Sequence, residues 1–203
     1  MKRELTAALF VLSCVWSYGQ STEHLTLKQV SFLYFSMSDT NVQSYHLPEN
    51  FVKPKKWVDA EKSRFDHEFY GGTYPKTYEL EDALSAIDTA KNFSTVCAAK
   101  SWCLHNYEQV FPFLVARLSM KTFVGLKNTG DLIIWERFLS GDLKFYGHGG
   151  GMQEDIFTIA GRASWILNEL TGESFAVVHA DLTEAQAIEF KRLWVDYVKV
   201  LGK

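Results

Sequence analysis

The residues best suited to chemistry lie in one short stretch, FYGHGGGMQED, which runs from Phe145 to Asp155. His148 stands among four glycines there, and two acids close the stretch. Imidazole, phenol and carboxylate groups are the usual proton donors and acceptors of active sites and binding sites. We therefore take Tyr146, His148, Glu154 and Asp155 as candidate binding residues, while no residue is predicted to be catalytic.

The HGGG motif, His148 to Gly151, resembles the oxyanion loop of lipases and esterases of the α/β-hydrolase fold. That resemblance implies a serine on a strand-to-helix elbow, followed by an acid and a histidine. The nearest match is GESFA, with Ser174 at its centre and only His179 and Asp181 close behind. No alternating series of strands and helices accompanies it, so the sequence argues against a hydrolase of this fold.

Phosphate and metal sites are equally poorly supported by the sequence. A P-loop needs a lysine and a hydroxyl residue after its last glycine, where this chain has Met152 and Gln153. The six histidines are dispersed and form neither H-x-x-x-H nor H-E-x-x-H. We predict no metal and no cofactor. The simplest interpretation of the stretch is a glycine turn whose two acids begin the next helix.

The first nineteen residues have the layout of a secretory signal peptide: Lys2 and Arg3, a short apolar run, then small or polar residues up to Gly19. Cleavage there would leave Gln20 as the new terminus and no transmembrane segment. An alternative is that VLSC is a lipoprotein signal that lipidates Cys14 and anchors the protein to the membrane. The predicted location is therefore secreted or periplasmic, or else lipid-anchored.

Composition indicates one folded domain with no affinity for nucleic acid. The chain has 203 residues and a net charge of −3, and removal of Lys2, Arg3 and Glu4 would change 21 basic and 24 acidic residues to 19 and 23. A mildly acidic chain is not attracted to polyanions. We predict a signal peptide at 1–19, an N-terminal helix with long loops wrapping the core at 20–78, and a helical domain at 79–203.

Two cysteines would remain after cleavage, Cys97 and Cys103. Six residues along one helix separate them by roughly 9 Å of rise, which is beyond disulfide reach. They are either a disulfide across a bend or, as we favour, two buried thiols.

Apolar stripes at helical spacing predict a mostly α-helical fold of packed antiparallel helix pairs. We expect helices from about Leu80 to Ala90, around Val96–Cys103 with Ser94 as its cap, and from Tyr107 to Leu118 with an Asn106–Gln109 capping box. Three more are expected near 132–139, 156–170 and 187–201. The last has capping-box spacing at both Asp181–Glu184 and Thr183–Gln186. Weaker signals suggest helices near 27–37 and 58–65.

Residues 93–138 resemble a HEAT-type helical pair. The helix VFPFLVARL has V-x-P-x-L-x-x-x-L character and is followed by a polar connector and the apolar run of DLIIWERF. In that family, stacked helix pairs bind other proteins without chemistry. The resemblance therefore implies a protein partner. The helix pairs are predicted to form either a HEAT-like array or an orthogonal helical bundle.

The sequence favours an exported, non-catalytic protein that mediates protein–protein interaction or assembly. The alternative is a small extracytoplasmic enzyme or ligand-binding protein with its site around His148. An exposed apolar or aromatic surface without a converging polar cluster is expected for the first function. A pocket at His148 with a second ionisable group is expected for the second.

Overall fold

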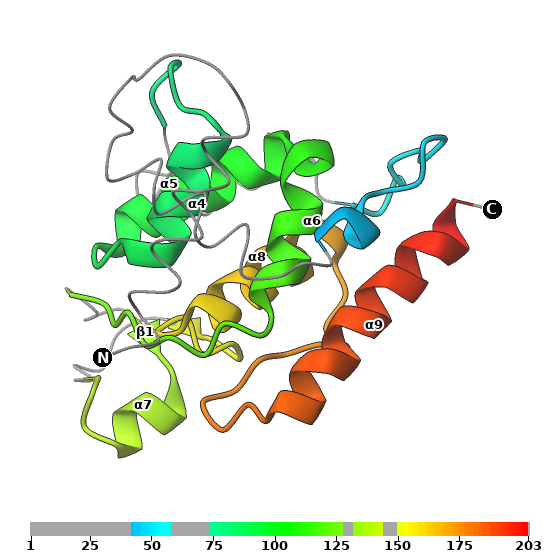
Figure 1. The fold of residues 1–203 in the computed structure, drawn as a ribbon. Coiled ribbons are helices and arrows are strands. Elements are labelled where there is room, and N and C mark those ends of the chain that lie inside the picture. Colours follow the sequence, from blue (N-terminus) through cyan, green and yellow to red (C-terminus); the bar gives the residue numbers. More distant parts are fainter. Residues whose placement is uncertain (1–41, 58–73, 128–131, 144–149, 203) are drawn as a thin grey trace, which may run out of the picture.

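The computed structural model describes residues 42–57, 74–127, 132–143 and 150–202, and these are mostly helical. Packed helix pairs form the core, as predicted: α4 packs on α5, and α6 packs on α8 (Figure 1). The predicted signal peptide, Cys14 and the expected helices near 27–37 and 58–65 lie outside the described residues. Within the described residues, no helix has both the length and the apolar character needed to cross a membrane.

Helices α4 (Leu80–Thr89) and α5 (Phe93–His105) follow one another after a three-residue connection. α4 buries the predicted face, including Ala83, Leu84 and Ile87. At the start of α5, the side chain of Asn92 accepts a hydrogen bond from the backbone N–H of Ser94. We expected Ser94 itself to be the cap. The helix begins earlier because the Asn92 amide oxygen binds one of its unpaired N–H groups.

Helix α6 (Tyr107–Arg117) contains Pro112 within its length. The predicted capping box at its start is wrong, because the Asn106 side chain makes no capping bond to α6. Its amide nitrogen instead donates to the carbonyl of Trp102, 2.9 Å away on α5. The side chain of Asn106 therefore closes the end of α5 rather than capping α6, although Asn106 is the residue at which α6 starts.

Helix α8 (Ile159–Thr171) is the most deeply buried of the described helices and packs on α6. Thr158 caps it through Gly161 N–H, and Gly172 ends it at a φ of 69°, as expected for a glycine at a helix end. A Cβ on Gly161 would lie 1.8 Å from the backbone oxygen of Asp155. The chain before α8 therefore packs so closely that only glycine fits there.

Helix α9 (Glu184–Leu201) runs along one side of the molecule and carries the predicted Thr183–Gln186 capping box (Figure 1). It buries Ala187, Trp194 and Val198. The 3-10 helix η1 (Val42–Tyr45) contacts α6, and Trp57 stacks on both Phe111 and Tyr197. Part of the long N-terminal segment thus packs against α6 and α9.

The helix expected near 132–139 is largely wrong. Leu132–Ile133 form strand β1, which pairs in parallel with β2 (Gly150–Gly151), and only Trp135–Leu139 are helical, as α7. Figure 1 shows α7 at the lower left, beyond β1 and away from α4 and α5. The tertiary partner strand, which the local apolar pattern cannot reveal, decides the conformation of residues 132 and 133.

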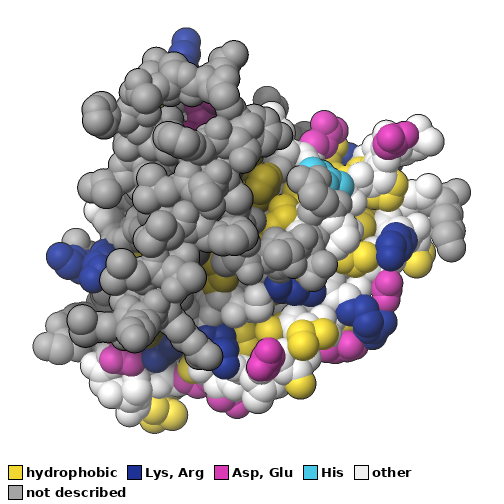
Figure 2. All heavy atoms as spheres, in the orientation of Figure 1, with side chains coloured by type: hydrophobic (Ala, Val, Ile, Leu, Met, Phe, Trp, Pro, Cys, Tyr) yellow, Lys and Arg dark blue, Asp and Glu magenta, His cyan; other side chains and the backbone are white. Residues whose placement is uncertain are grey.

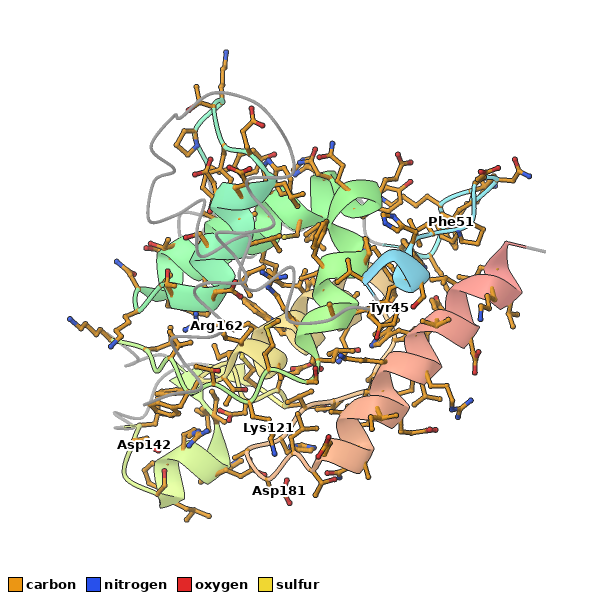
Figure 3. All side chains as sticks on the ribbon, viewed as in Figure 1. Tyr45, Phe51, Lys121, Asp142, Arg162 and Asp181 are labelled. Atoms are coloured by element: carbon orange, nitrogen blue, oxygen red, sulfur yellow. The ribbon has the colours of Figure 1, made fainter. Side chains whose placement is uncertain are left out.

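Two buried arginines connect the core elements. Arg117 on α6 donates through Nε and Nη2 to both carboxylate oxygens of Asp88 on α4, each 2.8 Å away. Arg162 on α8 donates to three carbonyls in different segments, those of Ile156, Ile87 and Gly125. Burial lowers the pKa of Arg162 to about 10, so the guanidinium is still charged at neutral pH. Figure 3 labels it near the middle of the molecule.

Candidate functional site

The candidate site is built on the ends of the glycine-rich stretch, since Tyr146 and His148 lie outside the described residues. Leu143 precedes the undescribed part and is buried, and β2 follows it. The pairing of β2 with β1 continues in a bond from Met152 N–H to the Ile133 carbonyl, 2.9 Å long. Residues 150–152 are therefore fixed against the segment that leads into α7.

Asp155 is fully buried and is held by Arg137 of α7. Arg137 Nε lies 2.9 Å from Oδ1 and Nη2 lies 2.6 Å from Oδ2, so the pair is bidentate. The interpretation of Asp155 as a first-turn helix acid is wrong, because Thr158 is the cap and Asp155 precedes it by three residues. Its carboxylate neutralises a guanidinium instead.

Glu154, the other acid of the stretch, contacts a different set of polar groups from those around Asp155. It is 8% exposed and accepts a hydrogen bond of 2.8 Å from the Asn168 amide nitrogen on α8. Ser164, one turn earlier, donates to the Ala176 carbonyl and accepts from Val178 N–H. Glu154 thus also precedes α8 rather than lying in its first turn, and its contacts connect the stretch to α8.

Arg137 contacts both sides of the glycine-rich stretch. Besides Asp155, its Nη1 lies 3.2 Å from an oxygen of Asp142, which Figure 3 labels beside α7. The guanidinium also lies over the rings of Phe123 and Phe157, 4.8 and 5.8 Å from their centroids. The hydrogen bond to Asp155 is the main reason that the pKa of Arg137 is raised above its ordinary value. The guanidinium is therefore fully committed to structural contacts.

Glu136 gives α7 a second polar contact. Its Oε2 accepts a hydrogen bond from Ala180 N–H, 2.9 Å away, and its Oε1 lies 3.8 Å from His179 Nδ1. The hydrolase constellation considered for Ser174 is not formed, because Ser174 is exposed in the loop after α8 rather than on a strand-to-helix elbow. His179 contacts α7 instead.

Helix α7 exposes large apolar side chains. Trp135, Phe138 and Leu139 are 63%, 37% and 79% exposed, and the helix buries none of its residues. The rings of Trp135 and Phe138 meet edge to face at 5.8 Å. Phe123 is 51% exposed beside Arg137. We call Trp135, Phe138, Leu139 and Phe123 the α7 face, and Figure 2 shows hydrophobic side chains on the surface where Figure 1 places α7.

The sequence does not identify the α7 face, since its apolar pattern predicts one helix near 132–139. The structure shows only five helical residues before Ser140 and Gly141, too few for a self-supporting helix, and this length is not visible in the sequence. Trp, Phe and Leu on so short an element need either a core to enter or a partner to cover them.

The two cysteines, Cys97 and Cys103, lie buried on α5 as thiols rather than a disulfide. Burial raises the pKa of the Cys103 thiol well above its usual range, which keeps it protonated and unreactive. Among the residues that the structure describes, no group of three or more histidine, cysteine, aspartate and glutamate side chains is arranged to hold a metal ion.

Comparison with known proteins gives no match: no family model fits the chain, and neither a curated protein nor a solved structure is similar to it. The described residues show no evidence of a HEAT repeat, because the second helix of the pair expected at 93–138 is replaced by β1 and the short α7.

Proposed function

We propose that this protein is an exported, non-catalytic helical protein that binds another protein through the α7 face. The exposure of Trp135, Phe138 and Leu139 on a helix that buries nothing supports the proposal most directly. Aromatic residues are enriched at protein interfaces and supply much of their binding energy. A surface helix needs none of them for its own stability.

The polar groups near the α7 face favour binding over catalysis. Asp155 and Asp142 are both bound to Arg137, and Glu136 is bound to Ala180 N–H. A general acid or base must be able to exchange a proton with a substrate. Carboxylates that hold an arginine or a backbone N–H in place are poorly suited to that task.

A protein partner fits the α7 face better than a membrane surface. Binding to an anionic bilayer draws on basic residues around the apolar ones. On α7, the single basic residue is Arg137, which is paired with two aspartates, and Glu136 lies on the same helix. The net charge of −3 for the whole chain adds no attraction.

Site-specific photocrosslinking tests the proposed function. A photoreactive phenylalanine analogue would replace Leu139 in living cells of the source organism, with the analogue at Ile188 of α9, 63% exposed, as the matched control. We expect one discrete protein adduct from position 139 and none from 188. The partner, purified, should bind Trp135→Ala about tenfold more weakly and Ile188→Ala unchanged.

Equal adducts from both positions, or an affinity that Trp135→Ala leaves unchanged, would contradict recognition by the α7 face. Recognition of a protein would also be overturned, in favour of a lipid surface, if the protein bound phosphatidylglycerol vesicles and Trp135→Ala abolished that binding.

Export is tested separately, by mass spectrometry of the mature chain. It predicts a terminus at Gln20 or a lipidated Cys14, and an intact Met1 would contradict it.

A further inference from the structure

Helix α7 lacks the contacts that stabilise the other helices. It has five residues and buries none of them, whereas α8 buries nearly its whole length. Isolated helices this short are not stable in water, because forming the first turn costs more than its few hydrogen bonds return. Contacts with the rest of the molecule must therefore keep α7 folded.

The polar contacts of α7 within the described residues converge on Arg137. Its guanidinium binds both oxygens of the fully buried Asp155, reaches Asp142 after the helix, and lies over two phenylalanine rings. Glu136 adds the bond to Ala180 N–H and the longer approach to His179. Bidentate arginine–carboxylate pairs are among the strongest side-chain contacts. The Glu136 side chain is 45% exposed, so its contacts are weakened by water.

We infer that α7 opens and closes as a local unit, and that the Arg137–Asp155 pair is the latch that keeps it closed. Opening exposes no side chain of α7 that is fully buried, uncovers the largely buried Arg137 side chain, and allows water to reach the Asp155 carboxylate. The free energy of this opening is therefore well below that of global unfolding. Arg137 is a positioning residue, since it sets the order of the α7 face without belonging to it. The role of the latch in recognition rests on the proposed function, but the latch itself does not.

Amide hydrogen exchange tests the latch without any partner. The probes are the N–H groups of Phe138 and Ser140, which donate to the carbonyls of Ile134 and Glu136. In Arg137→Met we expect these two amides to exchange about tenfold faster or more, while amides of α8 accelerate by no more than the loss of global stability requires and stay far better protected than those of α7. Arg137→Lys keeps the charge but not the bidentate pair, and should restore part of the protection. Arg192→Met removes an exposed ion-pair arginine on α9 and serves as the control.

Two results would overturn the inference. One is unchanged exchange of Phe138 and Ser140 in Arg137→Met. The other is a variant that fails to fold, or whose α7 amides are as well protected as those of α8, because α7 would then open only with the whole domain. Either result leaves the crosslinking test of the proposed function intact. Absence of an adduct at position 139 would contradict the proposed function but not the inference about the latch.

Discussion

Two arginine–aspartate pairs of the same geometry hold different parts of this molecule. Arg117 binds Asp88 inside the core, and Arg137 binds Asp155 at the base of α7, each through Nε and Nη2 to the two carboxylate oxygens. The Arg117 side chain is fully buried, whereas that of Arg137 is 15% exposed. What differs most is the helix that carries each arginine. α6 buries Val110, Phe111, Leu114 and Val115, and α7 buries nothing.

The two pairs indicate that the contribution of an ion pair to stability depends on which part of the fold must move when the pair is lost. A charge stranded in the core cannot reach water unless the domain unfolds. An Asp155 carboxylate left without its partner beneath α7 can reach water, because α7 can move away while exposing little further apolar surface of its own. The Arg117–Asp88 pair therefore contributes mainly to the stability of the whole domain, and the Arg137–Asp155 pair mainly to the local order of α7.

The largest effect is expected for Arg117→Met, which leaves Asp88 buried without its partner. Breaking a buried pair on one side typically costs about 3–5 kcal/mol. Urea denaturation followed by circular dichroism measures this loss in the free energy of unfolding. A loss below about 1 kcal/mol would mean that water reaches Asp88, and the comparison between the two pairs would fail.

Gly161→Ala is expected to be nearly as damaging. The new Cβ would lie 1.8 Å from the Asp155 backbone oxygen, so the backbone itself must shift. We expect a loss of about 3 kcal/mol in the free energy of unfolding, at the upper end for overpacked sites. Gly141→Ala is the control, because a Cβ added there would meet nothing within 4 Å. Its positive φ alone should cost about 1 kcal/mol.

Arg137→Met should have a smaller global effect than Arg117→Met, although the lost hydrogen bonds have the same form. We expect a loss of about 1–2 kcal/mol, limited by the free energy needed to open α7 and hydrate Asp155. The same urea titration measures it. A loss equal to that of Arg117→Met would show that α7 is part of the cooperative core.

Glu154→Gln should change stability by less than about 1 kcal/mol. The acid is buried and takes one hydrogen bond, from Asn168, and glutamine keeps an oxygen that can accept it. Asp155→Asn, one residue later, removes the charge that neutralises Arg137 and should cost more. Equal losses for the two neighbours would contradict the different roles assigned to them.

The smallest effect on stability is expected for Trp135→Ala, because the side chain is 63% exposed. Its free energy of unfolding should stay within about 0.5 kcal/mol of the unchanged protein. A thermal melt is sufficient to detect a departure from this. A larger loss would mean that Trp135 stabilises the fold, and would remove the main reason for assigning it to recognition.

Sequence reasoning located the longer helices because their signals are local. α4, α8 and α9 each combine an apolar face with an end signal, such as the Thr183–Gln186 box or Gly172. The misjudged helix start at Glu154 and Asp155 had a better local signal nearby, since Thr158 immediately precedes α8. Acids after glycines are a weaker indication of a helix start than a capping hydroxyl.

The candidate site was harder to predict because its contacts are long-range. Arg137 and Asp155 are 18 residues apart, and Glu136 and Ala180 are 44 apart. Likewise, β1 is a strand only because Gly150 and Gly151 lie beside it. No apolar pattern within 132–139 distinguishes a buried helix from a strand followed by an exposed turn of helix, and so the α7 face emerged only in three dimensions.

Native-state hydrogen exchange in low concentrations of urea tests most directly the central claim that α7 is held apart from the cooperative core. We expect the amides of Phe138 and Ser140 to exchange through a small opening that urea hardly affects, while those of α8 follow global unfolding. If the α7 amides instead share the opening free energy and the urea dependence of α8, then α7 unfolds only with the core and the claim is contradicted.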